Sequence, residues 1–193
     1  MRIPALFTAI ALTLGSPSLA LAGNPPESHA HVSSAVGHFA AIGKALSEDS
    51  LAGVPKHAAE LKATMDSPQA AEHHAGGAHG SDMAAKHEQM KSALDVLARS
   101  GLSLDDAREA YKSLSAAFVP MAEGTYERAP ADPNWVVMSC PMAKAEWIQA
   151  DGTVANPYYG TKMSTCGSKS TDLGSAPASA AVPGKAGHDH GGH

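Results

Sequence analysis

The stretch SLDDAREAYKSLSAAFVPM, residues 103–121, carries the pattern that decides the fold. Its apolar side chains recur at alternating spacings of three and four residues: Leu104, Ala107, Tyr111, Leu114, Phe118 and Met121. This spacing places them along one face of an α-helix. Ser103 and Asp106 resemble a capping box at the start, and Pro120 is expected to close the helix.

Three earlier stretches show the same helical period, over residues 29–46, 54–65 and 81–97. Their apolar stripes are Val32, Val36, Phe39, Ile42 and Leu46; Leu51, Val54, Ala58, Leu61 and Met65; and Met83, His87, Met90, Leu94 and Leu97. Pro55 fits only in a first turn, which allows the second helix, whose stripe begins at Leu51, to start as late as Val54. Four helices joined mostly by short links predict an all-α fold, an antiparallel four-helix bundle.

Length and composition predict one domain, or at most two small ones. It has 193 residues, of which 44% are hydrophobic and 5% aromatic. The two cysteines exclude a disulfide-dense scaffold. Lysine and arginine are not clustered and the net charge is −5, so we expect no general affinity for nucleic acid.

The N-terminus is typical of a secretory signal peptide over residues 1–22. Arg2 precedes an apolar run, and Ala20-Leu21-Ala22 forms a small-x-small cleavage site. We expect cleavage after Ala22, a periplasmic or secreted location, and no membrane span in the mature chain. Residues 23–28 are expected to form a disordered lead-in.

Histidines gather in two segments that lack core-forming side chains. Residues 69–80 form a linker expected within the domain 29–167, and residues 168–193 a disordered tail. Both are expected to bind metal weakly, through His73, His74, His79, His188, His190 and His193. His38 and His57 stand singly within helices and are expected to be ordinary satisfied histidines.

Residues 135–167 leave the helical pattern and contain both cysteines. We expect an irregular loop or short hairpin rich in Cys, Met, Trp and Tyr, with a turn at Asn156-Pro157. Cys140-Pro141-Met142 at one end mirrors Met163-x-x-Cys166 at the other. Thiolates and thioethers are soft donors that favour Cu(I), with Ag(I) an alternative, so Cys140, Met142, Met163 and Cys166 form the candidate metal site.

The same two cysteines are equally suited to a disulfide. An exported protein with two cysteines normally pairs them, and a bond between Cys140 and Cys166 would contribute about 3.5 kcal/mol in the chain-entropy model. Met142 and Met163 would then merely pack beside it. The sequence leaves both states open, including a redox switch between them.

The series Cys-Pro-Met, Trp147, Asn-Pro-Tyr-Tyr-Gly, Met163 and Cys-Gly resembles a known family. It is similar to a periplasmic domain of unknown function, found alone or fused to membrane-fusion adaptors of copper and silver efflux systems. The resemblance covers about residues 30–167 and implies a helical bundle in a copper context, with an efflux adaptor or other envelope protein as partner. It implies no catalytic activity.

Two functions follow as hypotheses. The first is a periplasmic copper-binding protein that sequesters or hands on Cu(I) in metal resistance or efflux. The second is a disulfide-capped helical interaction module of the envelope or an efflux system. An enzyme is not expected, because the chain has no haem-attachment, nucleophile-elbow, zinc-helix or phosphate-loop motif.

Overall fold

A computed structural model describes residues 26–67 and 80–174 of the chain. Four helices come first: α1 (Pro26–Ser47), α2 (Val54–Met65), α4 (Gly80–Leu97) and α5 (Leu104–Thr125). Strands β1 (Trp135–Cys140), β2 (Ala145–Ala150) and β3 (Ser168–Asp172) follow, with the short 3₁₀ helix η1 (Gly160–Met163) before β3. The predicted signal peptide, most of the His-rich linker and the tail from residue 175 onwards lie outside the described residues.

The helices pack in a ring, in which α1 contacts α2, α2 contacts α4, α4 contacts α5 and α5 contacts α1. The sequence predicted this part of the fold well. Helix α2 starts at Val54 with Pro55 in its first turn. The Ser103 side chain caps α5 by accepting a hydrogen bond from the Asp106 N–H, as the capping-box pattern indicated.

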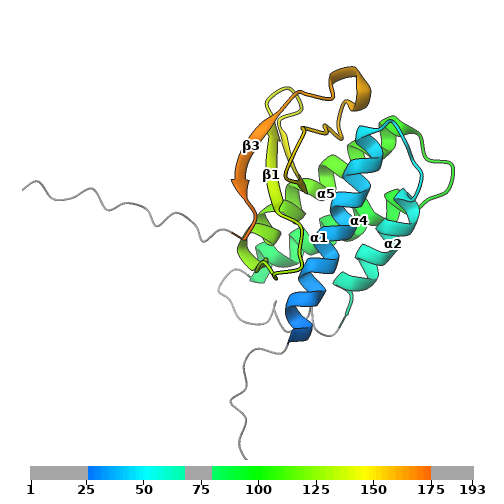
Figure 1. Ribbon diagram of the computed structural model, residues 1–193. Helices are drawn as coiled ribbons and strands as arrows, with labels where there is room; N and C mark the ends of the chain where they lie inside the picture. Colours follow the sequence, from blue (N-terminus) through cyan, green and yellow to red (C-terminus); the bar gives the residue numbers. More distant parts are fainter. Residues whose placement is uncertain (1–25, 68–79, 175–193) are drawn as a thin grey trace, which may run out of the picture.

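The prediction of an all-α fold is wrong, because a three-stranded antiparallel sheet completes the domain. Its strand order is β2-β1-β3, and β2 contacts both α1 and α5, so the sheet covers that side of the helices (Figure 1). Strand β1 has the sequence WVVMSC, a nearly continuous apolar run that is buried along most of its length. Such runs suit a central strand that is covered by its neighbours.

Two further boundaries differ from expectation. Pro120 lies inside α5, which continues to Thr125. Proline removes the hydrogen bond to the carbonyl four residues earlier, but Ala116 and Pro120 are both exposed, so water can satisfy that carbonyl. The fold also continues past Gly167, where a disordered tail was expected, since β3 pairs with β1 and Leu173 is buried.

A row of aromatic rings connects the helical core with the sheet. Phe39 of α1 stacks on Phe118 and Tyr111 of α5, with ring centroids 4.5 and 4.9 Å apart. Tyr111 approaches Tyr158 at 6.0 Å, and Tyr158 meets Trp147 of β2 edge-to-face at 5.9 Å. The bundle and the segment that carries the cysteines therefore share one core.

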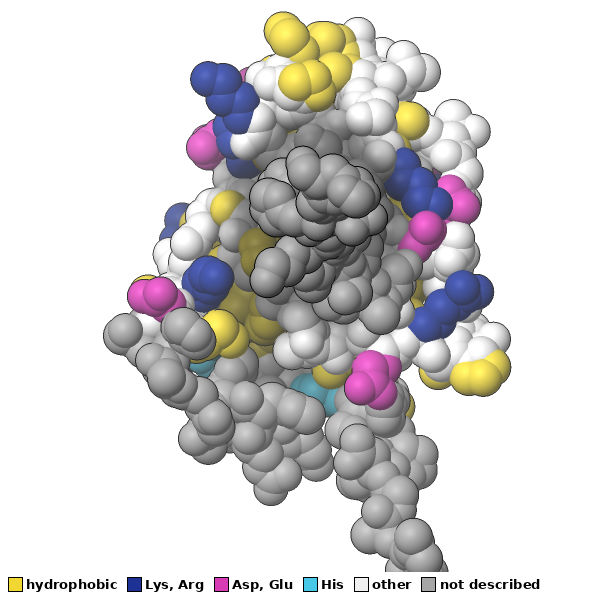
Figure 2. All heavy atoms as spheres, turned by 90° about the vertical axis from the view of Figure 1, so that its left-hand side faces the viewer, with side chains coloured by type: hydrophobic (Ala, Val, Ile, Leu, Met, Phe, Trp, Pro, Cys, Tyr) yellow, Lys and Arg dark blue, Asp and Glu magenta, His cyan; other side chains and the backbone are white. Residues whose placement is uncertain are grey.

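The surface of the described part is mixed in charge. Figure 2 shows lysine and arginine side chains close to acidic ones on one face, with hydrophobic side chains gathered at its upper end. None of the helices in residues 26–67 and 80–174 has the length and apolar character needed to cross a bilayer.

Candidate functional site

The two cysteines meet where the central strand ends and the last strand begins. Cys140 is the final residue of β1, and Cys166 lies two residues before β3. Because β1 and β3 are antiparallel neighbours with Ser139 opposite Ser168, the strand pairing brings the cysteines together. Their Sγ atoms are 3.0 Å apart and both are free thiols. We call residues 140–142 and 156–166 the sulfur loop.

Asn156 organises the sulfur loop from a fully buried position. Its side-chain NH₂ donates to the Cys166 carbonyl at 2.7 Å, and its side-chain oxygen accepts from the N–H groups of Tyr158 and Tyr159 at 2.8 and 3.2 Å. Its own N–H donates to the Ser164 carbonyl. The turn expected at Asn156-Pro157 is thus a built corner held by one amide side chain.

An ion pair fastens this corner to the helices. Arg108 of α5 pairs with Asp49 of the α1–α2 connection and donates to the carbonyls of Leu46 and Pro157. Asp49 in turn accepts from the N–H and hydroxyl of Thr161. Gly160 has φ +57°, and a Cβ there would lie 1.9 Å from Asp49 Oδ1. Only glycine allows this approach.

Aromatic side chains of the sheet and of the loop itself pack around the sulfur loop. Gly167 has φ +137°, and a Cβ on it would come within 2.6 Å of the Trp147 ring. The hydroxyls of Tyr158 and Ser115 both donate to the Glu146 carbonyl. The indole N–H of Trp147 donates to Gln149 at 3.0 Å. The chain next to Cys166 therefore packs against aromatic side chains that are themselves hydrogen-bonded.

The surroundings shift the pKa values of the two thiols in opposite directions. Burial alone would raise the pKa of Cys140, but hydrogen bonds from the Cys166 thiol, the Ala143 N–H and the Asn156 side chain outweigh it and lower that pKa. The pKa of Cys166 is raised, first because its thiol proton is held by Cys140 and second by burial. These directions imply that Cys140 loses its proton before Cys166 does.

The two predicted methionine ligands lie on the same segments as the cysteines. The Met142 N–H faces both sulfur atoms, and the Met163 carbonyl accepts a hydrogen bond from the Cys166 N–H at 3.0 Å. Within residues 26–67 and 80–174, the large hydrophobic side chains that stay exposed are Met142 and Met163, at 64% and 38%. Neither thioether is part of the core.

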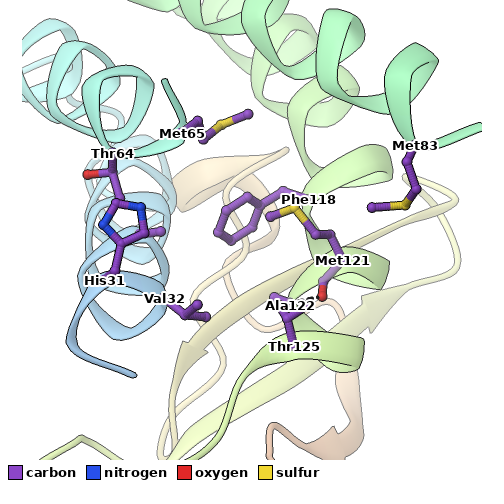
Figure 3. A pocket seen from close by; sticks show the side chains of 10 residues that line it. His31, Val32, Thr64, Met65, Met83, Phe118, Met121, Ala122 and Thr125 are labelled. Carbon is purple, nitrogen blue, oxygen red and sulfur yellow. Dashed lines mark hydrogen bonds between the residues drawn. The ribbon is translucent and has the colours of Figure 1, made fainter. Parts of the chain in front are cut away.

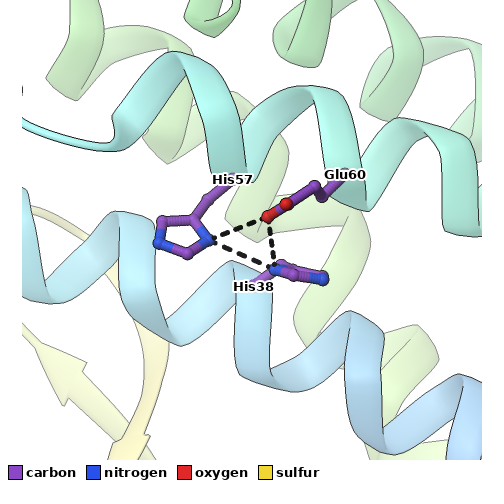
Figure 4. A group of neighbouring side chains, drawn as sticks. All are labelled: His38, His57 and Glu60. Carbon is purple, nitrogen blue, oxygen red and sulfur yellow. Dashed lines mark hydrogen bonds and ion pairs between the residues drawn. The ribbon is translucent and has the colours of Figure 1, made fainter.

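A second group of donor atoms was missed by the sequence reasoning. His38 of α1 faces His57 and Glu60 of α2 (Figure 4). The two Nδ1 atoms are 3.2 Å apart, and each lies 3.3 Å from Glu60 Oε2. The pKa of His38 is lowered, chiefly by burial and also by His57 and Lys56, although Glu60 opposes this. We call these three residues the imidazole cluster.

Sequence spacing could predict that His57 and Glu60 are neighbours, but not that His38 joins them. His57 and Glu60 are three residues apart, which places them on one face of α2. Nothing in the sequence sets the register of α1 against α2, and that register decides that His38 is their neighbour. The six histidines predicted as weak ligands in the linker and tail lie outside the described residues.

An apolar pocket opens at the end of the bundle near the start of α1. Its volume is about 90 Å³, and thioethers from three helices, Met65, Met83 and Met121, line it around Phe118 (Figure 3). His31 stands at its edge, with Nε2 3.0 Å from the Ser67 hydroxyl. Met83 and Met121 were expected on apolar stripes, and here they form walls of this pocket.

Comparisons of the chain with protein-family models, with curated proteins and with solved structures give no match.

Proposed function

We propose that this protein binds a soft monovalent metal ion, Cu(I) in the first place and Ag(I) as an alternative, at the sulfur loop. The observation that carries the proposal is the meeting of two free thiols at 3.0 Å in a loop whose backbone also carries two exposed methionines, Met142 and Met163. Thiolate and thioether sulfur are the donors that select Cu(I) over hard cations. An exposed methionine loses the stabilisation of burial, which a role as metal ligand would explain.

Binding requires a small opening of the pair. Sulfur donors at about 2.3 Å from a tetrahedral ion are about 3.8 Å apart, so the sulfurs must separate by about 0.8 Å. Cys140 is fully buried, whereas Cys166 is half-buried and lies in a loop. Cys166 is therefore the residue expected to move, while the Cys140 thiolate provides the first ligand.

The location of the site at the surface suits sequestration or transfer. Met142 and Met163 are accessible to solvent, so an ion could arrive or leave through thioether exchange without unfolding of the bundle. The copper context and an efflux adaptor as partner are supported by the motif resemblance alone, and periplasmic or secreted location by the signal-like N-terminus.

A second candidate function rests on the same distance. Sulfurs 3.0 Å apart are also close to the 2.05 Å of a disulfide bond. Thiol–disulfide exchange with an external disulfide, which would accept two electrons and two protons from the thiols, would convert the sulfur loop into a cystine cap, with a stabilisation of about 3.5 kcal/mol in the chain-entropy model. The protein would then be a disulfide-capped interaction module of the envelope rather than a metal carrier.

Titration of the reduced mature chain with Cu(I) against a chelating competitor tests the first function. We expect one tight site whose affinity falls more than about a hundredfold in the Cys140→Ser, Cys166→Ser double variant, beyond the loss from removing an outer-shell partner. Met142→Leu and Met163→Leu should each weaken binding by about tenfold. Met83→Leu is the matched control, because its thioether lines the distant apolar pocket.

Unchanged Cu(I) affinity in the double cysteine variant would refute the site. The second function is tested by intact-mass analysis of protein alkylated directly in fresh extract. Thiols that react only after reduction would favour the cystine cap, and thiols that react at once would exclude it.

A further inference from the structure

The geometry points to a second, chemically different metal site: we propose that His38, His57 and Glu60 bind a borderline divalent ion, Zn²⁺ or Cu²⁺, between α1 and α2. The site is independent of the sulfur loop. It takes another class of ion, because imidazole and carboxylate donors suit divalent Zn and Cu, whereas thioethers suit Cu(I).

The distances among the donor atoms match those of a tetrahedral face. Zinc binds imidazole nitrogen at about 2.0–2.1 Å and carboxylate oxygen at about 2.0–2.2 Å, so two donors of one tetrahedral ion lie about 3.3–3.5 Å apart. The three separations in the cluster are 3.2, 3.3 and 3.3 Å. An ion can therefore enter with little change in the three side chains.

The donors are held by the two helices rather than by flexible chain. His57 and Glu60 are one turn apart on α2, and α1 and α2 pack directly on one another. The side chains of His38, His57 and Glu60 are 24%, 32% and 39% exposed. The site is therefore packed against the helices on one side and open to solvent on the other. The fourth ligand position faces solvent and suits a water molecule.

The two carboxylate oxygens of Glu60 face different neighbours. Oε2 faces the imidazoles, whereas Oε1 lies 3.9 Å from the ammonium of Lys56. Lys56 is 73% exposed, so it can swing away when a cation binds. Without an ion, a proton shared among the three donor atoms would explain the same short distances. The experiment must distinguish a metal from this proton.

Cobalt(II) serves as a spectroscopic probe in the full mature chain carrying Cys140→Ser and Cys166→Ser, so that the sulfur loop cannot contribute. We expect intense visible absorption of tetrahedral cobalt that Zn²⁺ abolishes by competition. His38→Gln, His57→Gln and Glu60→Gln should each weaken binding by about tenfold or more, at least the loss from an outer-shell partner. His-rich segments are identical in all these variants and add a constant background.

Two substitutions are matched controls. Glu48→Gln removes an exposed carboxylate that also pairs with a lysine four residues away, Lys44, and that lies outside the imidazole cluster. His31→Gln removes an α1 histidine outside the cluster. Both should keep the cobalt spectrum and affinity of the parent. Equal binding by the cluster variants and the controls would overturn the proposal.

A measurement on the unsubstituted cluster guards against misfolded variants. In ¹⁵N spectra of the histidine rings, Zn²⁺ should shift Nδ1 of His38 and His57, while their Nε2 atoms remain protonated. Coordination through Nε2, or at other histidines alone, would also overturn the proposal. Because this readout needs no cysteine, the sulfur-loop function can fail while the imidazole site stands, and the reverse.

Discussion

The sulfur loop and the imidazole cluster both bring together donor atoms that are far apart in the sequence, but different structural elements do this in the two cases. Each joins donors from segments separated in sequence, by 26 residues for the cysteines and by 19 for the histidines. The cysteines are placed by strand pairing and by the buried amide of Asn156, whereas the histidines are placed by the packing of α1 on α2. The first site depends on a built corner, and the second needs only the helices.

This difference has a chemical consequence. The Cys140 sulfur is fully buried and hydrogen-bonded, so its reactivity is controlled by neighbours. The imidazoles and Glu60 are part-exposed, so the solvent reaches them directly. Variants that damage the corner should therefore affect soft-metal binding and leave divalent-ion binding unchanged.

The largest expected effect comes from Asn156→Ala. It leaves the Cys166 carbonyl and the N–H groups of Tyr158 and Tyr159 without their partner, so the free energy of unfolding should fall by about 3 kcal/mol. Cu(I) affinity should fall with it, while zinc affinity remains that of the parent. Chemical denaturation and the two metal titrations measure this.

Asn134→Ala is the control for that variant. Asn134 also binds two side chains, Asp151 and Arg128, but at the surface, so its loss should cost less than about 1 kcal/mol. Equal destabilisation by the two substitutions would show that Asn156 has no special role in the corner.

A smaller effect is expected for Gly160→Ala. The residue has φ +57°, and the added Cβ would displace Asp49 and Arg108, so the free energy of unfolding should fall by about 2 kcal/mol. Gly124→Ala in α5 is the control, because a Cβ there meets nothing within 4 Å. Thermal unfolding compares the two; a neutral Gly160→Ala would contradict the account of how the corner docks on the helices.

The smallest effect is a change in thiol titration. In reduced protein, ultraviolet thiolate absorbance should rise in two steps, one below and one above the ordinary cysteine pKa of about 8.5. In Cys166→Ala the pKa of Cys140 should rise, because burial remains and one donor is lost. In Cys140→Ala the pKa of Cys166 should fall for the converse reason.

If the parent protein shows no rise in absorbance below the ordinary cysteine pKa, the lowered pKa of Cys140 is contradicted. The imidazole cluster provides an internal comparison, since zinc binding should be identical in both single-cysteine variants.

The sequence predicted the helices because burial there follows a 3.6-residue period over many turns, as in α5. The sheet was predicted only in part: β1 and β2 form the short hairpin that was one of the alternatives for residues 135–167, but the third strand was missed for identifiable reasons. Strand β1 is apolar without alternation, and β3 has the sequence SKSTD, polar and largely exposed, so no pattern distinguishes it from a tail. Its place comes from pairing with β1, which is a tertiary contact.

The candidate site was predicted in part. The mirrored cysteine and methionine spacing indicated that Cys140 and Cys166 meet, and they do. The corner that holds them depends on Asp49 and Arg108, which are 112 and 52 residues from Thr161 and Gly160 respectively, and no local pattern reports such a distance. The imidazole cluster escaped for the same reason, since His38 reaches His57 through helix packing.

Because Cys140 lies at the end of the central strand, a link between the two cysteines would hold β3 against β1. β3 is an edge strand that pairs with β1, and it begins two residues after Cys166. A bond or an ion between the cysteines would pin the start of β3 to β1 and suppress local fraying there. Amide hydrogen exchange in Ser168–Asp172 should therefore slow when the cysteines are joined, so the edge of the sheet reports the state of the sulfurs.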